Sequence, residues 1–219
     1  MIYTGVIFDF NGTLFWDTKL HNKAWDIFLT KHNLSLSDED KFRKMHGKNN
    51  KDIFVSFFGE SISDDQIQNY ILEKEGIYQE LCLKTDIQLA PGAVGFLNFL
   101  KENKIPFTIA TASGKENVDF YFKYLPLSDW FEYDKVVYNN GKIKGKPDPQ
   151  IYQLAMEMIG KKPEEVIVFE DAVAGLQAAK NARAGKIIVV DSNDDDYSDW
   201  KEHQIIKSFD EVSRSLFKL

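Results

Sequence analysis

The chain has 219 residues, 43% of them hydrophobic and 14% aromatic, enough for one sizeable core or a core domain with a smaller partner. Its formal net charge of -7 and pI near 5.2 argue against nucleic acid or an anionic membrane as the main partner. No apolar run approaches the length of a transmembrane helix, and the first residues lead into a strand rather than a signal peptide.

The first expected strand, at 4–10, contains the apolar run V-I-F. Asp9 follows this run directly, and Gly12 breaks it, so the Asp9 carboxylate is placed at the carboxyl end of the strand. In open α/β sheets that edge is where ligands bind. Asp9 is therefore a candidate reactive group.

The residues after this strand are predicted to form a helical block. Apolar side chains recur there at helical spacing, and no convincing strand is expected before Ile105. The pattern predicts an all-helical domain at 16–87, inserted into a core domain formed by 1–15 and 88–219. The expected helices span 17–31, 37–45, 51–58 and 63–80.

From residue 88 onward, expected strands alternate with expected helices. This alternation is typical of an α/β fold with a parallel, doubly wound sheet. A final amphipathic helix is expected at 209–217, after an acidic, solvated loop at 191–199. The expected strands are 105–110, 135–138, 166–169 and 186–190, and the other helices 93–102, 115–124, 148–159 and 172–182.

Polar side chains follow three of the expected strands, and a lysine precedes one of the expected helices. Because the carboxyl ends of parallel strands share one edge, we expect these groups to converge. Clustered carboxylates without His or Cys favour Mg²⁺, and a carboxylate can attack phosphorus while hydroxyls and a lysine hold the phosphate oxygens. The residues concerned are Asp9, Thr111, Ser113, Lys146, Glu170 and Asp171.

Four segments of the chain resemble the motifs of the haloacid dehalogenase superfamily, in that family's order. D-F-N-G-T-L begins at Asp9, T-A-S at Thr111 and K-P-D-P at Lys146, and F-E-D-A-V-A-G spans Phe169–Gly175. The helical block resembles the family's cap domain, and the layout is most similar to the β-phosphoglucomutase and phosphoglycolate phosphatase branch. The resemblance implies a Rossmann-like core that carries an inserted cap.

The resemblance implies a role for each motif residue. Asp9 is the expected nucleophile, and Thr111 or Ser113 is expected to bind the transferring phosphoryl group. Lys146 is expected to steady both the nucleophile and the phosphate. Asn117 occupies a frequent family position whose role is less defined.

The same resemblance implies a Mg²⁺ site and exposes one departure from the family. The metal ligands are expected to be Asp9, the backbone carbonyl of Asn11, and Asp171 with Glu170 beside it. Asn11 stands where the family carries an aspartate that protonates the leaving group and then activates water. An amide cannot exchange a proton at neutral pH, and such help is worth about 10²–10⁴-fold in rate. A slow or unusual catalyst is the expected result.

The helical block offers weaker candidates for contacts with substrate. His21 is one, and Lys48 and Lys51 flank the loop at Gly47. The family's C–P hydrolases use a cap lysine, but neither of these two matches its spacing. Sugar-phosphate mutases carry an arginine in this loop, where this chain has Asn50.

Three functions remain open from the sequence. The first is a Mg²⁺-dependent phosphatase acting on a small phosphorylated metabolite, such as a sugar phosphate or a phosphoglycolate-like compound. The second is a sugar-phosphate mutase or a C–P or C–halogen hydrolase, and the third is a non-catalytic sensor of a phosphorylated metabolite. The single cysteine, Cys82, cannot form an internal disulfide, which favours a cytoplasmic setting. A monomer is the default expectation, with a homodimer left open.

Overall fold

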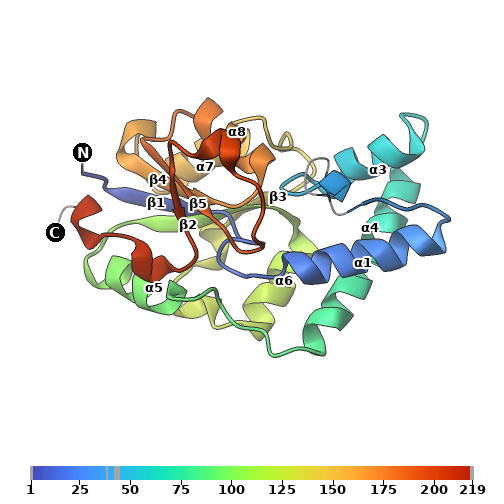
Figure 1. The fold of residues 1–219 in the computed structure, drawn as a ribbon, viewed down its shortest axis with the longest axis horizontal. Helices are drawn as coiled ribbons and strands as arrows, with labels where there is room; N and C mark the ends of the chain where they lie inside the picture. The colour runs from blue at the N-terminus through green and yellow to red at the C-terminus, as the bar shows by residue number, and fades with distance from the viewer. Residues whose placement is uncertain (1, 38, 42–44, 218–219) are drawn as a thin grey trace.

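A six-stranded parallel sheet forms the centre of the fold (Figure 1). The computed structural model describes residues 2–37, 39–41 and 45–217. The strand order is β3-β2-β1-β4-β5-β6, so β1 lies in the interior of the sheet between β2 and β4. The strands are β1 (Gly5–Phe8), β2 (Phe107–Gly114), β3 (Val137–Asn139), β4 (Val166–Glu170), β5 (Lys186–Val190) and β6 (Gln204–Ile206).

Helices cover both faces of this sheet, as a doubly wound fold requires (Figure 1). Successive side chains of β1 point to opposite faces: Val6 and Phe8 pack with α5 and α6, and Ile7 packs with α7 and α8. Each face therefore has its own apolar cluster, and the predicted α/β fold is confirmed. The four helices are α5 (Ala93–Glu102), α6 (Lys115–Tyr124), α7 (Gln150–Met158) and α8 (Val173–Asn181).

Within the described residues, three further helices form a block at one end of the sheet, away from both termini (Figure 1). Trp25, Phe28 and Phe54 are buried together at the centre of this block. Tyr78 and Cys82 are instead buried in the cluster that also covers the sheet, so α4 joins the block to the core. The domain limits at 16–87 remain a prediction. The helices are α1 (Thr18–Lys31), α3 (Asn50–Phe58) and α4 (Asp64–Leu83).

The helix expected at 37–45 lies partly outside the described residues, since 38 and 42–44 are among those not described. None of the helices in the described part of the chain combines the length and the apolar character needed to cross a membrane. The four core helices α5, α6, α7 and α8 begin within two residues of their expected positions.

The expected C-terminal helix at 209–217 is wrong. The segment forms two short 3-10 turns, Phe209–Glu211 and Arg214–Leu216, and the edge strand β6 precedes them. The hydroxyls of Ser208 and Ser213 accept hydrogen bonds from backbone N–H groups two residues later, which competes with a continuous helix. Phe209 and Phe217, at the two ends of the segment, are both buried in the core cluster.

Candidate active site

The carboxyl ends of three neighbouring strands bring the expected site residues to one edge. Phe8, the last residue of β1, pairs with Phe169 of β4, so Asp9 and Glu170 leave the sheet side by side. The backbone N–H of Asp9 donates to the carbonyl of Phe169 at 2.9 Å. On the other side of β1, β2 carries Thr111 to this edge. The order of the strands thus creates the site.

Lys146 joins the two carboxylates at this edge. Its ammonium donates to Asp9 Oδ1 at 2.5 Å and to Glu170 Oε2 at 2.7 Å, and the lysine is only 2% exposed. The hydroxyl of Tyr152, on α7, donates to the same Glu170 oxygen. Burial lowers the pKa of Lys146, but the two carboxylates raise it by more, so the lysine remains charged. The Lys146 ammonium therefore pairs with two buried carboxylates, those of Asp9 and Glu170.

Asp171 adds a third buried carboxylate. Its Oδ1 accepts a hydrogen bond from the Thr13 hydroxyl at 3.0 Å. Glycine lets the chain approach this group closely: a Cβ on Gly12 would lie 2.1 Å from Asp171 Oδ2, and Gly12 also has a φ of +79°. A Cβ on Gly175 would lie 1.9 Å from Glu170 Oε2. The carboxylates of Asp171 and Glu170 thus pack directly against the backbone of a glycine, where any side chain would clash.

These carboxylates fit a divalent cation. Each of Asp9, Glu170 and Asp171 offers one oxygen, and the three oxygens lie within 4.8 Å of one another. Burial, followed by the charge of Glu170, raises the pKa of Asp9 to about 7 against the opposing effect of Lys146. The same two causes raise the pKa of Asp171 well above its usual range. The excess negative charge and the oxygen ligands suit Mg²⁺.

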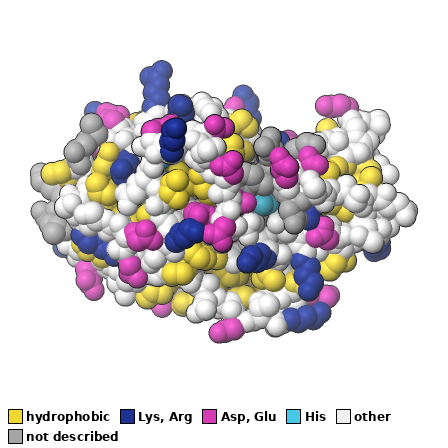
Figure 2. Space-filling view, viewed as in Figure 1, with side chains coloured by type: hydrophobic (Ala, Val, Ile, Leu, Met, Phe, Trp, Pro, Cys, Tyr) yellow, Lys and Arg dark blue, Asp and Glu magenta, His cyan; other side chains and the backbone are white. Residues whose placement is uncertain are grey.

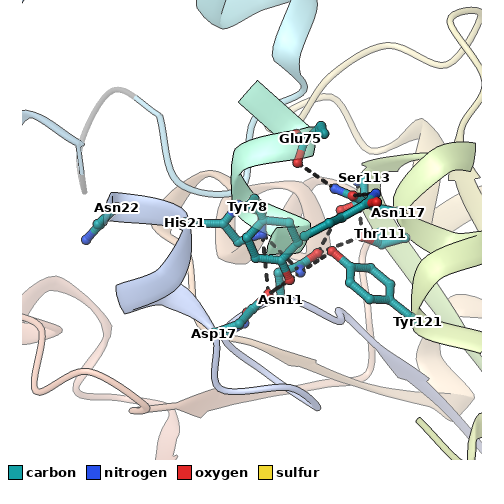
Figure 3. A network of polar contacts seen from close by, with 12 residues as sticks. Asn11, Asp17, His21, Asn22, Glu75, Tyr78, Thr111, Ser113, Asn117 and Tyr121 are labelled. Atoms are coloured by element: carbon teal, nitrogen blue, oxygen red, sulfur yellow. Dashed lines mark hydrogen bonds and ion pairs between the residues drawn. The ribbon is translucent and has the colours of Figure 1, made fainter. Parts of the chain in front are cut away.

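Asn11 lies at the centre of a hydrogen-bond network between core and helical block (Figure 3). Its Nδ2 donates to Asp17 Oδ2 at 2.6 Å and to the Tyr121 hydroxyl at 2.7 Å. Its Oδ1 accepts from the Ser113 hydroxyl at 2.8 Å. The hydroxyl of Tyr78 donates to the same Asp17 carboxylate. These partners fix the orientation of the amide.

The predicted phosphate-binding hydroxyls lie beside Asn11. Thr111 is buried, and its Oγ1 accepts a hydrogen bond from the backbone N–H of Ser113 at 3.1 Å. Both residues line a cavity at the carboxyl edge of the sheet. Lys146, paired with Asp9, is absent from the cavity lining, whereas Asp9 is part of it. Asp9, Asn11 and Asp171 line the same cavity.

The helical block closes the other side of this cavity. Of the substrate candidates in the block, His21, Lys48 and Asn50 line it. Lys51 does not: its ammonium is 2.8 Å from Asp64 and its side chain is 58% exposed. Apolar walls come from the same block, and they consist of Trp25, Met45 and Ile53.

Sequence reasoning missed two charged residues of α4 that line the cavity, Lys74 and Glu75. Lys74 is 2% exposed, and its ammonium lies 2.9 Å from Nδ1 of His21 and 3.0 Å from Glu75 Oε1. One signal was available, because Lys74 falls at helical spacing between the inward-facing Ile71 and Tyr78. A charged residue on the buried face of a helix needs partners.

Comparison with known proteins identifies the family. The family model for haloacid dehalogenase-like hydrolases matches residues 3–183. The chain belongs to this family. Both the family and the hydrolase class expected from the sequence are therefore confirmed.

Relatives of this hydrolase include named phosphatases and solved structures. It is 30% identical over 186 residues to the phosphorylated carbohydrates phosphatase of Thermotoga maritima, covering 83% of this chain and 82% of that one. It is 30% identical over 175 residues to hexitol phosphatase A of Escherichia coli, covering 78% and 76%. A crystal structure of a HAD hydrolase, family IA, variant 3, from Entamoeba histolytica matches 99% of this chain and 97% of its own, with a TM-score of 0.86 and 34% identity.

Proposed function

We propose that this hydrolase is a Mg²⁺-dependent phosphatase that acts on a small phosphorylated carbohydrate or polyol through Asp9. The observation that carries the proposal is the position of Asp9: a buried carboxylate, paired with Lys146, that lines a cavity together with Thr111 and Ser113. A nucleophile, a balancing cation and hydroxyl donors for phosphate oxygens therefore meet at one point.

The first step transfers the phosphoryl group to the protein. An oxygen of Asp9 forms a bond to phosphorus while the bond to the leaving-group oxygen breaks, and the electron pair leaves with that oxygen. Water then attacks the aspartyl-phosphate, which releases inorganic phosphate and restores Asp9. The hydroxyl of Thr111 binds a phosphate oxygen during both steps, and that of Ser113 does so when it exchanges its hydrogen bond to Asn11 for one to phosphate.

Lys146 and the metal site balance charge in this scheme. The charge of Lys146 favours the ionised, attacking form of Asp9, and the same ammonium pairs with Glu170. Asp9, Asp171 and the carbonyl of Asn11, with Glu170 beside them, would hold Mg²⁺, which would supply positive charge against the negative charge that develops on phosphate.

Asn11 makes proton transfer the weak step. Its side chain is an amide whose hydrogen bonds to Asp17, Tyr121 and Ser113 are all used to fix its orientation. A carboxyl at this position would give a proton to the leaving group and take one from water. Because the amide can do neither, we expect slow turnover, and higher rates for leaving groups that depart without a proton.

The cavity and the relatives together support the substrate class. One relative is named a phosphorylated carbohydrates phosphatase and another a hexitol phosphatase. The face drawn in Figure 2 shows acidic and basic side chains interspersed rather than gathered by sign. These features fit a small substrate whose charge is balanced by groups inside the cavity rather than by a charged patch on the surface.

We propose a cytoplasmic location and a monomeric state.

A non-catalytic sensor of the same metabolites is the second candidate, and Asn11 favours it. The test is release of inorganic phosphate from p-nitrophenyl phosphate and a panel of polyol and sugar phosphates with Mg²⁺. If the protein is a phosphatase, phosphate is released with Mg²⁺, and both Asp9→Asn and added EDTA abolish this release. Full activity in Asp9→Asn would overturn the proposal. Binding without turnover, with a long-lived aspartyl-phosphate in the mass spectrum, would establish the sensor.

A further inference from the structure

Glu75 is a buried carboxylate that the proposed reaction does not use. It lies on α4, is 5% exposed and lines the cavity opposite the nucleophile. Burial raises the pKa of Glu75, but Lys74, His21 and the amides of Asn117 and Asn50 lower it by more. A buried ionised carboxylate destabilises the folded protein unless its hydrogen-bond partners offset the cost of desolvation. The partners of Glu75 therefore indicate its role.

Three segments of the chain donate hydrogen bonds to Glu75. Its Oε1 accepts from Asn50, the first residue of α3, at 2.7 Å and from Lys74 at 3.0 Å. Its Oε2 accepts from Asn117, on α6 of the core, at 2.8 Å, a bond drawn in Figure 3. Gln79, one turn further along α4, donates to Asn117 Oδ1 at 2.9 Å.

The direction of these bonds sets the orientation of Asn117. Because Gln79 donates to its carbonyl oxygen, the amide nitrogen of Asn117 faces Glu75. Asn117 thus ties the core to α4 at two points, and the contact holds Glu75 at the cavity wall. The role of Asn117 in this chain, which the resemblance leaves less defined, is therefore to join the core to α4.

Glu75 has room for one more donor. A carboxylate offers about four acceptor positions, and donors from the described residues occupy three of them. Beside it, the Lys74 ammonium is a donor. A hydroxyl group both donates and accepts, so it can bond to Glu75 and Lys74 together. A second phosphate would instead place like charge against Glu75.

We propose that Glu75 binds a hydroxyl of the substrate's leaving group and thereby selects polyol and sugar phosphates, and that Asn117 positions it by joining the core to α4. Glu75 is a specificity-determining residue, and Asn117 is a positioning residue. The inference rests on the proposed phosphatase function, because it concerns the part of the substrate that departs from phosphorus.

The test compares two substrates in one set of variants. Sorbitol 6-phosphate and glycerol 3-phosphate carry hydroxyls on the leaving group, whereas the leaving group of p-nitrophenyl phosphate has none to offer. Glu75→Gln replaces an ionised acceptor that has two oxygens with a neutral amide that has one. We expect kcat/KM for the better polyol phosphate, relative to the aryl phosphate, to fall about tenfold to a hundredfold.

Asn117→Ala should lower the same ratio through KM for the polyol phosphate, and by a smaller factor than Glu75→Gln. The double variant should lose less than the product of the two single losses, because both changes remove the same contact. Glu80→Gln is the matched control: Glu80 lies on the same helix, is exposed, and should leave the ratio unchanged. Should Glu75→Gln fail to fold, Asn117→Ala and Gln79→Ala still test the proposal.

Two results would overturn it. One is an equal loss on both substrates in Glu75→Gln, which would mean that Glu75 only supports the packing of α4 on the core. The other is a wild-type KM for the better polyol phosphate that is no lower than the KM for the aryl phosphate, since a bond from Glu75 to the leaving group should favour binding. Failure of the phosphatase function itself is separate, since it would appear as absence of Asp9-dependent release from the aryl phosphate.

Discussion

Replacing Asn11 with aspartate would give the site a proton carrier. The Asn11 amide nitrogen lies 2.6 Å from Asp17 Oδ2, so Asn11→Asp brings a second carboxyl oxygen to that distance. Two ionised carboxylates so close repel by about 6 kcal/mol at an effective dielectric constant of about 20. Since one pKa unit corresponds to about 1.36 kcal/mol, the pair holds one proton at neutral pH. That proton is available to the leaving group.

We expect kcat for Mg²⁺-dependent phosphate release to rise by about 10²–10⁴-fold in Asn11→Asp, most for alkyl phosphates and least for p-nitrophenyl phosphate. The assay is steady-state phosphate release over pH 5–9 for both substrates. Asn11→Ser, which removes the amide without adding a carboxyl, is the control and should show no gain. An unchanged kcat for alkyl phosphates in Asn11→Asp would refute the reasoning, because proton transfer would then not limit turnover.

Three further predictions concern stability and reactivity. Since the pKa of Asp9 rises from 3.8 to about 7 on folding and that of Asp171 rises too, the metal-free protein should lose stability as pH increases from about 4 to 7. Urea unfolding in EDTA should show this loss, up to about 4 kcal/mol from Asp9, and Mg²⁺ should oppose it; stability that increases over this range in EDTA would contradict the charge assignment. Lys146→Met leaves two buried carboxylates without their cation and should cost about 3–5 kcal/mol, against at most about 1 kcal/mol for the surface control Lys51→Met. A loss of similar size in both variants would refute the difference. Burial raises the pKa of Cys82 to about 12, so its thiol should react with Ellman's reagent only after unfolding; fast labelling of the native protein would show that it is accessible.

The sequence was sufficient to predict the core of the site because its residues lie at the ends of strands. The position of Asp9 follows from the apolar run before it, and that of Glu170 follows from the run of β4. Parallel pairing of those strands then brings both to one edge. Lys146 was predicted from its motif, and the structure places its ammonium between the two carboxylates.

The cavity wall formed by the helical block could not be predicted in the same way. Lys74 is neutralised by Glu75 and faces His21, which is far from it in the sequence and comes close only when α1 packs on α4. Asp17 likewise meets Asn11, Tyr78 and Tyr121 only in the folded protein. Helical periodicity identifies which face of α4 is buried, but not which other helix will lie against it.

In the C-terminal segment, the sequence predicted the buried side chains but not the backbone conformation. The apolar spacing of Phe209 and Phe217 is compatible with a helix, and both side chains are indeed buried. The backbone between them is instead held by serine hydroxyls, and the Arg214 guanidinium lies over the rings of Phe96 and Phe99. Tertiary contacts overrode local propensity here.

The interior position of β1 has a consequence for how the enzyme folds. Val6 pairs with Phe107 on one side and Ile167 on the other, roughly 100 and 160 residues along the chain. The β4–β5 pair, in contrast, joins Ile167 to Lys186 across a single helix. Closing long loops costs entropy and slows folding, so the local β4–β5 unit is expected to form early and β1 to insert late. Asp9 would then reach its partners only when the sheet is nearly complete, and partly folded chains would lack the proposed nucleophile in its place.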